Sequence, residues 1–285
     1  MNMKTVYLNK FMSSVVAELE MNGQYGTAHV CGSVLRSVMA FGGEGLPVSG
    51  ITPLWLKAYE GYLLHKGGKG LAWNTVSTYM RMLQAVYNRA VVRKLAAFIP
   101  HQFRDVFTGR KADHRRVLER DDMQKLLVER DPDITSPGMA WARACLELMF
   151  RFHGMPFVDL AHLRKSDLKD GYLTLRRRKT GMPLSARVDG RAMQLLERYR
   201  NRDDTSPYLL CFLDGNLEGM AAYRDYQRIL RLLNSRLRVL ALWKKVQGKV
   251  TSYSARHTWA TVGRYCHIPI EVISEGLGHA SVTTT

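Results

Sequence analysis

The sequence predicts a mainly α-helical protein with one small antiparallel β-sheet, built from two domains. Apolar residues recur at helical spacing over most of the 285 positions, and they alternate as in strands only in two short runs, 172–175 and 183–188. A polar, basic stretch without apolar periodicity divides the chain. We therefore expect a helical domain over residues 1–109, a basic linker over 110–116 and an α+β domain over 117–285.

The first domain is expected to hold four helices. Apolar positions repeat every three to four residues in the windows 6–19, 28–41, 54–64 and 76–92. Glycine pairs separate these windows at Gly42 and Gly43 and at Gly67 and Gly68, because glycine readily ends a helix. Asn74 is expected to cap the fourth helix.

The fourth helix has two contrasting faces. One is a broad apolar stripe, and the other carries short polar side chains and one arginine at intervals of three to four residues: Asn74, Ser77, Arg81, Gln84 and Asn88. Such a line suits a helix laid against DNA phosphates and base edges. An ordinary solvated helix face fits the same spacing equally well.

The second domain mixes helices with a β-hairpin. Helical spacing predicts helices over 121–127, 139–152, 190–199, 221–242, 254–265 and 270–277. The two alternating runs read as short strands, and the turn between them holds Lys179, Thr180 and Gly181. This order gives a helix-rich domain with a small sheet on one edge.

The composition indicates a polyanionic partner. Lys and Arg number 42 against 25 Asp and Glu, which gives a net charge of +17, and both residues 1–112 and the remainder share the excess. Double-stranded DNA is the leading partner, although ribosomal proteins and membrane-surface binders have similar compositions. No segment approaches the roughly 20 apolar residues of a membrane span, and no signal-peptide pattern is visible. A cytoplasmic location is therefore expected.

The four cysteines are expected to be reduced and buried. They lie far apart and show neither a CxxC pair nor a Cys/His ligand spacing: Cys31, Cys145, Cys211 and Cys266. We therefore expect neither a metal nor a cofactor.

Two short motifs near the C-terminus carry the chemistry. Arg256 and His257 start one predicted helix, and the run Leu277, Gly278 and His279 ends the next, so that Arg256 and His279 can converge on one phosphate. Taken singly, Arg256 could be a surface residue and Gly278 a helix stop. Together, the stretch TSYSARHTWAT and the LGHAS turn resemble the C-terminal box of the tyrosine recombinases, also called phage integrases.

This resemblance implies a helical SAM-like core-binding domain and a catalytic domain that cuts and rejoins DNA through a 3′-phosphotyrosyl intermediate. Arg256 would bind the phosphate oxygens through its planar guanidinium, and His279 would donate a hydrogen bond to them. Lys179 matches the family's hairpin lysine, which acts as general acid. Without the resemblance, the basic run that ends at Lys179 would be read as a site that only binds backbone phosphates. Such contacts are expected in any case from Arg177 and Arg178.

One departure from the family pattern concerns an arginine. Where the family reads TGLRxSEL, residues 153–160 read HGMPFVDL, which puts Pro156 at the arginine's place. Integrases of Bacteroides-type mobile elements also tend to lack this arginine, and the stretch NTVSTYMRMLQAVYNRAV resembles their core-binding domain. Phosphate stabilisation is then expected from one of three nearby arginines: Arg143, Arg151 or Arg176.

Another departure lies beside Arg256. Tyr253 stands where the family often has a histidine, and its hydroxyl can still donate a hydrogen bond to phosphate. His257 is expected to be a buried residue that orients its neighbours rather than a catalyst.

The family's nucleophilic tyrosine lies beyond Thr285, where this sequence ends. We therefore expect a chain truncated before its nucleophile, which binds DNA without cutting it. The full-length protein is expected to form a homotetramer on DNA, to be a monomer when free, and to work with accessory DNA-bending proteins. The alternative is a non-catalytic DNA-binding remnant of an integrase. A type IB topoisomerase would instead relax DNA without site preference.

Overall fold

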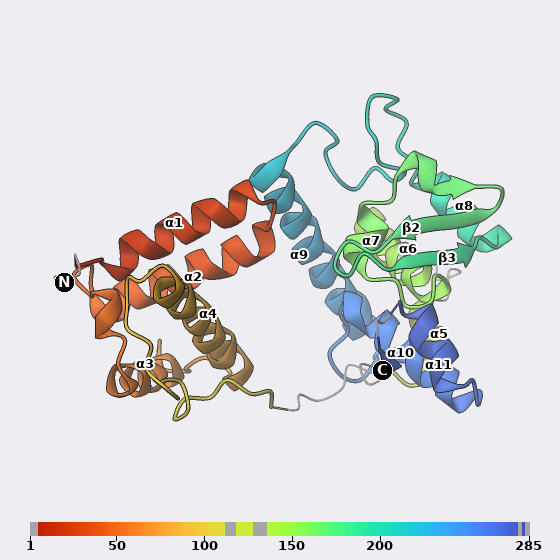
Figure 1. Cartoon of the computed structure of the whole chain (residues 1–285). Helices are drawn as coiled ribbons and strands as arrows, with labels where there is room; N and C mark the ends of the chain where they lie inside the picture. The colour runs from red at the N-terminus through yellow and green to blue at the C-terminus, as the bar shows by residue number, and fades with distance from the viewer. Residues whose placement is uncertain (1–4, 112–117, 128–135, 279–280, 283–285) are drawn as a thin grey trace. The chain divides into compact units, whose positions relative to one another are not determined.

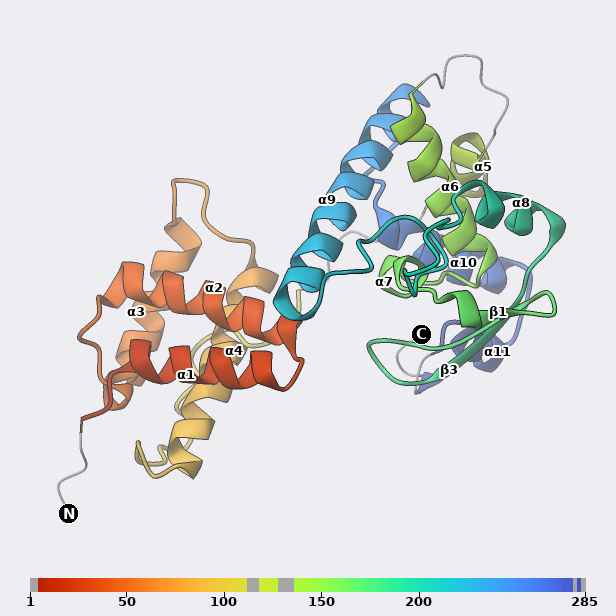
Figure 2. The same ribbon diagram turned by 90° about the horizontal axis from the view of Figure 1, so that it is seen from above.

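The computed structural model describes residues 5–111, 118–127, 136–278 and 281–282. The chain divides into two compact units, residues 1–113 and residues 114–285 (Figure 1, Figure 2). Most described residues are helical, and the strands form one small antiparallel sheet, which confirms the predicted fold class.

The first unit is a helical bundle, as the apolar spacing predicts. Its α-helices are α1 Leu8–Met21, α2 Tyr25–Gly42, α3 Pro53–His65 and α4 Trp73–Val92, with a 3₁₀ turn at Val48–Gly50. Helices α1 and α2 lie side by side (Figure 1, Figure 2). Apolar side chains from every helix are buried in the interior, among them Met12, Val34, Leu56 and Met80. Burial of each such side chain contributes about 1.5–3 kcal/mol.

The start of α4 differs from the prediction. The helix begins at Trp73, so Asn74 lies inside its first turn and not at the cap. The Asn74 amide instead exchanges two hydrogen bonds of 2.9 Å with the backbone N–H and carbonyl of Lys111. An asparagine amide offers both a donor and an acceptor, so it can pair with a passing backbone as well as cap a helix.

The second unit follows the predicted element order, with short additions. Its helices are α5 Arg120–Leu127, α6 Pro137–Arg151, α7 Phe157–Ala161, α8 Gly190–Arg198, α9 Gly219–Trp243, α10 Ser252–Tyr265 and α11 Ile270–Gly276. A 3₁₀ turn, η2, spans Lys165–Asp167. The five-residue helix α7 and this turn are absent from the sequence prediction.

The sheet of this unit contains the predicted hairpin and one further strand. Its strands are β1 Leu168–Lys169, β2 Tyr172–Arg176 and β3 Pro183–Arg187, antiparallel in the order β1-β2-β3. Leu173 pairs with Ala186, and both are buried, whereas the neighbouring Tyr172 and Thr174 are exposed. This alternation fixes which side chains of the hairpin face the core.

Helix α6 is the centre of the second unit. Every residue from Ala142 to Met149 is buried, which marks a helix enclosed on all sides. Helix α9 packs along it with Leu233, Leu237 and Leu240 inward. Helix α10 also contacts α6, so the same core positions the residues that α10 carries.

The cysteines are free, but only half of the burial prediction holds. Cys31 and Cys145 are buried, whereas Cys211 and Cys266 are exposed, because they lie in a loop and at the end of α10. None of the described helices combines the length and the apolar character needed to cross a membrane.

Candidate active site

Arg256 is positioned by the first turn of α10. Ser252 N donates to Asn234 Oδ1 of α9 at 2.8 Å, and Thr251 N donates to Ser254 Oγ at 3.1 Å. The first bond ties the start of α10 to α9, and the second closes the first turn of α10. One turn later, Arg256 faces inward and is only 7% exposed.

Two buried guanidinium groups meet at the turn that ends α11. Arg256 donates from Nη1 to Gly154 O at 3.1 Å and from Nη2 to Leu277 O at 2.8 Å. Arg177, which follows β2 and is 6% exposed, donates from Nη1 to the same Leu277 O at 2.6 Å and to Gly278 O at 2.7 Å. Because both groups reach one carbonyl oxygen, they lie close enough together for one phosphate to bridge them.

The carboxylate of Asp159 binds the two residues that follow β2, Arg177 and Arg178. Asp159 lies on α7 and is 1% exposed. Its Oδ2 accepts from Arg177 Nε at 3.3 Å, and its Oδ1 accepts from Arg178 N at 2.9 Å. Our sequence analysis did not select Asp159. The signal that could have found it is the acid of FVDL, which aligns with the acid of the family's TGLRxSEL segment.

The charge balance of the site favours an anion. Burial, and then repulsion from Arg177, lower the pKa of Arg256 to about 10. Arg256 therefore keeps its charge at neutral pH, although it is desolvated and faces a second cation. A bound phosphate would offset both effects, since it supplies negative charge and hydrogen-bond acceptors to the buried cations.

Two glycines allow the backbone to approach these arginines. Gly154 has φ +68°, and a Cβ atom there would lie 2.8 Å from Arg256 Cα. Gly278 has φ +60°, and its Cβ atom would lie 2.6 Å from Arg177 Cδ. Both positions therefore require glycine for conformation and for space.

We expect the substitution Gly154→Ala to destabilise the protein more than Gly171→Ala. Both glycines have positive φ, at +68° and +77°, but a Cβ atom at Gly171 meets nothing within 4 Å. The control thus carries only the conformational cost of about 1–2 kcal/mol. Gly154→Ala also forces apart two backbone segments, which costs about 1–3 kcal/mol more. Chemical denaturation measures the difference, and equal losses in the two variants would show that the approach to Arg256 is not tight.

Two of the three arginines expected to replace the family's arginine are bound to other groups, and the third is buried in α6. Arg151 binds the carboxylates of Glu147 at 3.0 Å and Asp189 at 2.6 Å. Arg176 is exposed and donates to a backbone carbonyl of its own hairpin at 3.1 Å. Arg143 is buried within the α6 core. Among the described residues, none of these three arginines donates a hydrogen bond to Leu277 O as Arg177 does.

Arg177 thus has a different place from the one we expected. It was grouped with surface contacts to DNA phosphates, yet it is buried beside Arg256, whereas Arg178 is exposed. Pro156 is the N-cap residue of α7, with φ −62°, and carries no charge. The second guanidinium of the site therefore comes from the end of β2 and not from the segment around Pro156.

Three further predicted site residues lie in the described part of the second unit: Lys179, Tyr253 and His257. Lys179 is exposed in the hairpin turn. Tyr253 is 45% exposed on the first turn of α10, close enough to influence the pKa of Arg256. The His257 ring packs against the Tyr253 ring with centroids 5.3 Å apart, and His257 is half-buried and not fully buried as expected. His279 lies outside the described residues.

The polar face of α4 is partly covered by the chain that follows it. Ser77 is fully buried and donates from Oγ to Gly109 O at 2.6 Å, while Asn74 binds the Lys111 backbone. Ser77 is therefore closed to solvent, whereas Asn74 remains exposed while its amide binds the Lys111 backbone. Three further side chains of the face reach solvent: Arg81, Gln84 and Asn88.

Two family models match the chain. The phage integrase SAM-like domain matches residues 7–104, and the phage integrase family matches residues 116–285. The second match covers more than half of the chain. The chain belongs to the phage integrase family. Arg177, Arg256 and Asp159 all lie within the region that the integrase model matches.

One curated relative is tyrosine recombinase XerA of Pyrococcus furiosus, which is 30% identical over 135 residues. This match covers 46% of the chain and 44% of XerA, so it spans less than half the length of that relative.

Solved structures of two integrases share the fold. The Tn1549 transposon integrase in complex with transposon right end DNA gives a TM-score of 0.67 at 15% identity, over 98% of this chain and 93% of that one. A lambda integrase tetramer bound to a Holliday junction gives 0.65 at 15% identity, over 99% and 80%.

Proposed function

We propose that this protein is a site-specific DNA recombinase that cuts and rejoins DNA through a 3′-phosphotyrosyl intermediate. The observation that carries the proposal is the convergence of Arg177 and Arg256 on Leu277 O, deep in a basic protein. Two buried cations at one point form a site for a single tetrahedral anion. The fold shared with integrases solved on DNA supports a DNA phosphate as that anion.

In the proposed reaction, a tyrosine hydroxyl gives up its proton to water and attacks the scissile phosphorus. A bond from phosphorus to the tyrosyl oxygen forms, and the bond to the 5′ oxygen breaks. Arg256 and Arg177 bind the nonbridging oxygens and stabilise the charge that grows on them. Lys179 donates a proton to the departing 5′ oxygen. Tyr253 and His279 add hydrogen-bond donors to the phosphate. Rejoining reverses these steps, with a 5′ hydroxyl as nucleophile and tyrosine as leaving group.

Double-stranded DNA is the proposed partner, bound through both units. The structure of lambda integrase as a tetramer on a Holliday junction supports a homotetramer on DNA for this protein too, with accessory DNA-bending proteins as further partners. The proposed setting is the cytoplasm, where chromosomal DNA is accessible.

We expect the affinity for duplex DNA to fall steeply with salt. A protein with a net charge of +17 displaces counterions from the phosphates that it contacts. For about 6–10 phosphate contacts, the affinity falls by about 10³- to 10⁵-fold between roughly 50 and 200 mM salt. Fluorescence anisotropy on a labelled duplex at several salt concentrations measures the slope. A flat dependence would contradict a phosphate-dominated interface.

The decisive experiment for the proposal traps the covalent intermediate. A duplex from the ends of the mobile element, nicked close to the cleavage point, lets a short fragment diffuse away after cleavage and blocks rejoining. The protein expressed to its natural stop codon should form a complex that survives SDS, and Arg256→Ala should not. Specific binding without any covalent complex would favour the alternative, a non-catalytic DNA-binding protein. Relaxation of supercoiled DNA without site preference would favour a type IB topoisomerase.

A further inference from the structure

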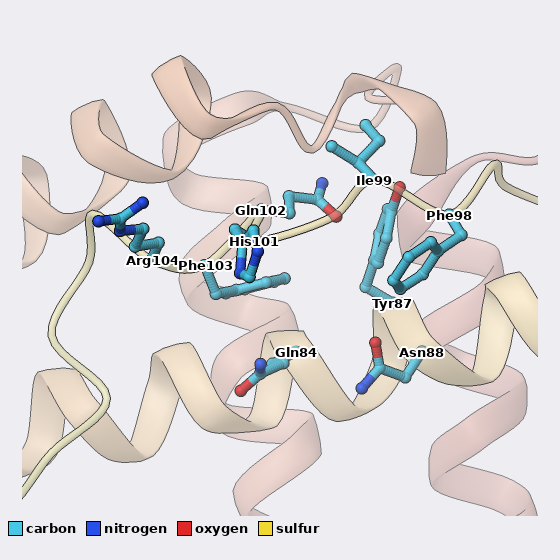
Figure 3. A pocket seen from close by; sticks show the side chains of 9 residues that line it. All are labelled: Gln84, Tyr87, Asn88, Phe98, Ile99, His101, Gln102, Phe103 and Arg104. Carbon is cyan, nitrogen blue, oxygen red and sulfur yellow. The ribbon is translucent and has the colours of Figure 1, made fainter.

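A cleft of about 430 Å³ lies in the first unit, between α4 and the segment that follows it (Figure 3). From α4, its lining comprises Gln84, Tyr87 and Asn88. From the following segment, it comprises Phe98, Ile99, His101, Gln102, Phe103 and Arg104. In Figure 3 Gln84 and Asn88 lie on α4 opposite the segment, with Tyr87 and Phe98 at one end of the cleft and Arg104 at the other.

One wall of the cleft contains a buried acceptor. Gln102 is 5% exposed, and its Nε2 donates to Ile51 O. Its Oε1 is buried and has no hydrogen-bond partner among the described residues. The Gln102 side chain is therefore closed to solvent and holds the segment against the Ile51 backbone.

The rest of the lining narrows the chemistry of the ligand. Side-chain amides at Gln84 and Asn88 offer paired donors and acceptors, which match the edges of nucleobases. Phe98 is 72% exposed, so its ring is open to stack on a planar group. His101 and Arg104 are exposed at the cleft and add hydrogen-bond donors and positive charge suited to a phosphate.

We propose that this cleft binds a single unpaired nucleobase. A paired base has its hydrogen-bonding edge occupied and both faces stacked, so it can neither stack on Phe98 nor present that edge to the amides of Gln84 and Asn88. An unpaired base exposes both edge and faces. This inference rests on the proposed function, because strand exchange separates the DNA strands and so supplies unpaired bases. A free nucleotide carries the same base chemistry and is the second source to be tested.

The test compares two DNA duplexes of identical sequence with the full chain. One is fully paired, and the other carries a single bulged 2-aminopurine; AMP serves as the free nucleotide. The wild-type protein should bind the bulged duplex about tenfold more tightly and quench 2-aminopurine fluorescence, because base stacking on an aromatic ring has an effect of this size. If DNA is the source of the base, AMP should displace the bulged duplex only at a concentration much higher than that of the duplex.

The variants Phe98→Ala and Phe98→Leu should abolish the preference for the bulge, because neither offers a ring to stack on, and should keep the affinity for paired DNA within about twofold. Phe98 is 72% exposed, so neither substitution disturbs the core. The matched control is Arg81→Ala, on α4 but outside the cleft, which should weaken both duplexes equally.

Equal affinity for the two duplexes, or a preference that survives both variants, would overturn the inference while leaving DNA binding intact. Absence of binding to either duplex would instead contradict the proposed function. In that case, AMP binding that Phe98→Ala abolishes would still support the base site, with a free nucleotide as its ligand.

Discussion

Replacing Arg177 by alanine should slow formation of the covalent DNA complex by about 10²- to 10³-fold, the effect of removing one preorganised donor from a charged transition state. Arg177 lies beside Arg256 at the Leu277 carbonyl, so its loss leaves one guanidinium to stabilise the phosphate. Single-turnover cleavage of the nicked substrate measures the rate. Arg177→Lys should restore little, because an ammonium cannot present the two parallel donors of a guanidinium.

The matched control is Arg176→Ala. Arg176 is the preceding residue in the same basic run, but it is exposed and donates only within its hairpin. We expect this variant to cleave within about threefold of the wild-type rate, as for most surface substitutions. Melting temperatures are measured in parallel, because Arg177→Ala leaves Asp159 buried without its partner, whereas Arg177→Lys keeps the charge. A slow Arg176 variant combined with a fast Arg177 variant would reverse our assignment.

Replacing Asp159 by alanine should cause the largest loss of stability. Its carboxylate is 1% exposed and holds the buried Arg177 side chain and the Arg178 backbone. Removing one partner of a buried ion pair costs about 3–5 kcal/mol, because the remaining charge is left desolvated. For a unit of this size, the melting temperature should fall by about 6–20 °C.

Inorganic phosphate should partly restore the melting temperature of the Asp159→Ala variant. The phosphate anion can bind Arg177 and Arg256, which lack a nearby carboxylate in this variant. The control is Asp204→Ala. Asp204 is fully exposed and forms only a 3.8 Å surface pair with Lys165, so its loss should not change the melting temperature measurably. Equal melting temperatures for the two variants would contradict the structural role that we assign to Asp159.

The long helices follow from the spacing of apolar residues. The window 221–242 predicts α9, which spans Gly219–Trp243, and the window 139–152 predicts α6, which spans Pro137–Arg151. Short elements do not follow in this way. Helix α7 has five residues, too few for a helical period to repeat, and yet it carries Asp159.

The role of Arg177 could have been predicted from the strand that precedes it. In β2 the inward side chains are Leu173 and Leu175, and continuing that alternation puts Arg177 on the core side and Arg176 outside. Our prediction selected Arg176 only because it lies near the other site residues in the sequence, and it assigned Arg177 to backbone phosphates of DNA. The partners of Arg177 could not be predicted from the sequence, because only tertiary packing brings Asp159 and Leu277 next to it.

The polar face of α4 shows a different limit of pattern reading. A helical spacing of short polar side chains is the same whether they face water, DNA or another part of the chain. Asn74 and Ser77 bind the backbone at Lys111 and Gly109, which lie far along the sequence. Only the three-dimensional structure distinguishes these two from Arg81 and Asn88 on the same helix.

The central claim is that Arg177 and Arg256 bind the same scissile phosphate. A structure of the full protein stalled on the nicked DNA substrate tests it most directly, through the distances from both guanidinium groups to the nonbridging oxygens. Our account predicts that Arg177 and Arg256 both lie within hydrogen-bond distance of one phosphate. A phosphate held by Arg256 and some other arginine, with Arg177 bound only to the Leu277 and Gly278 carbonyls, would contradict it.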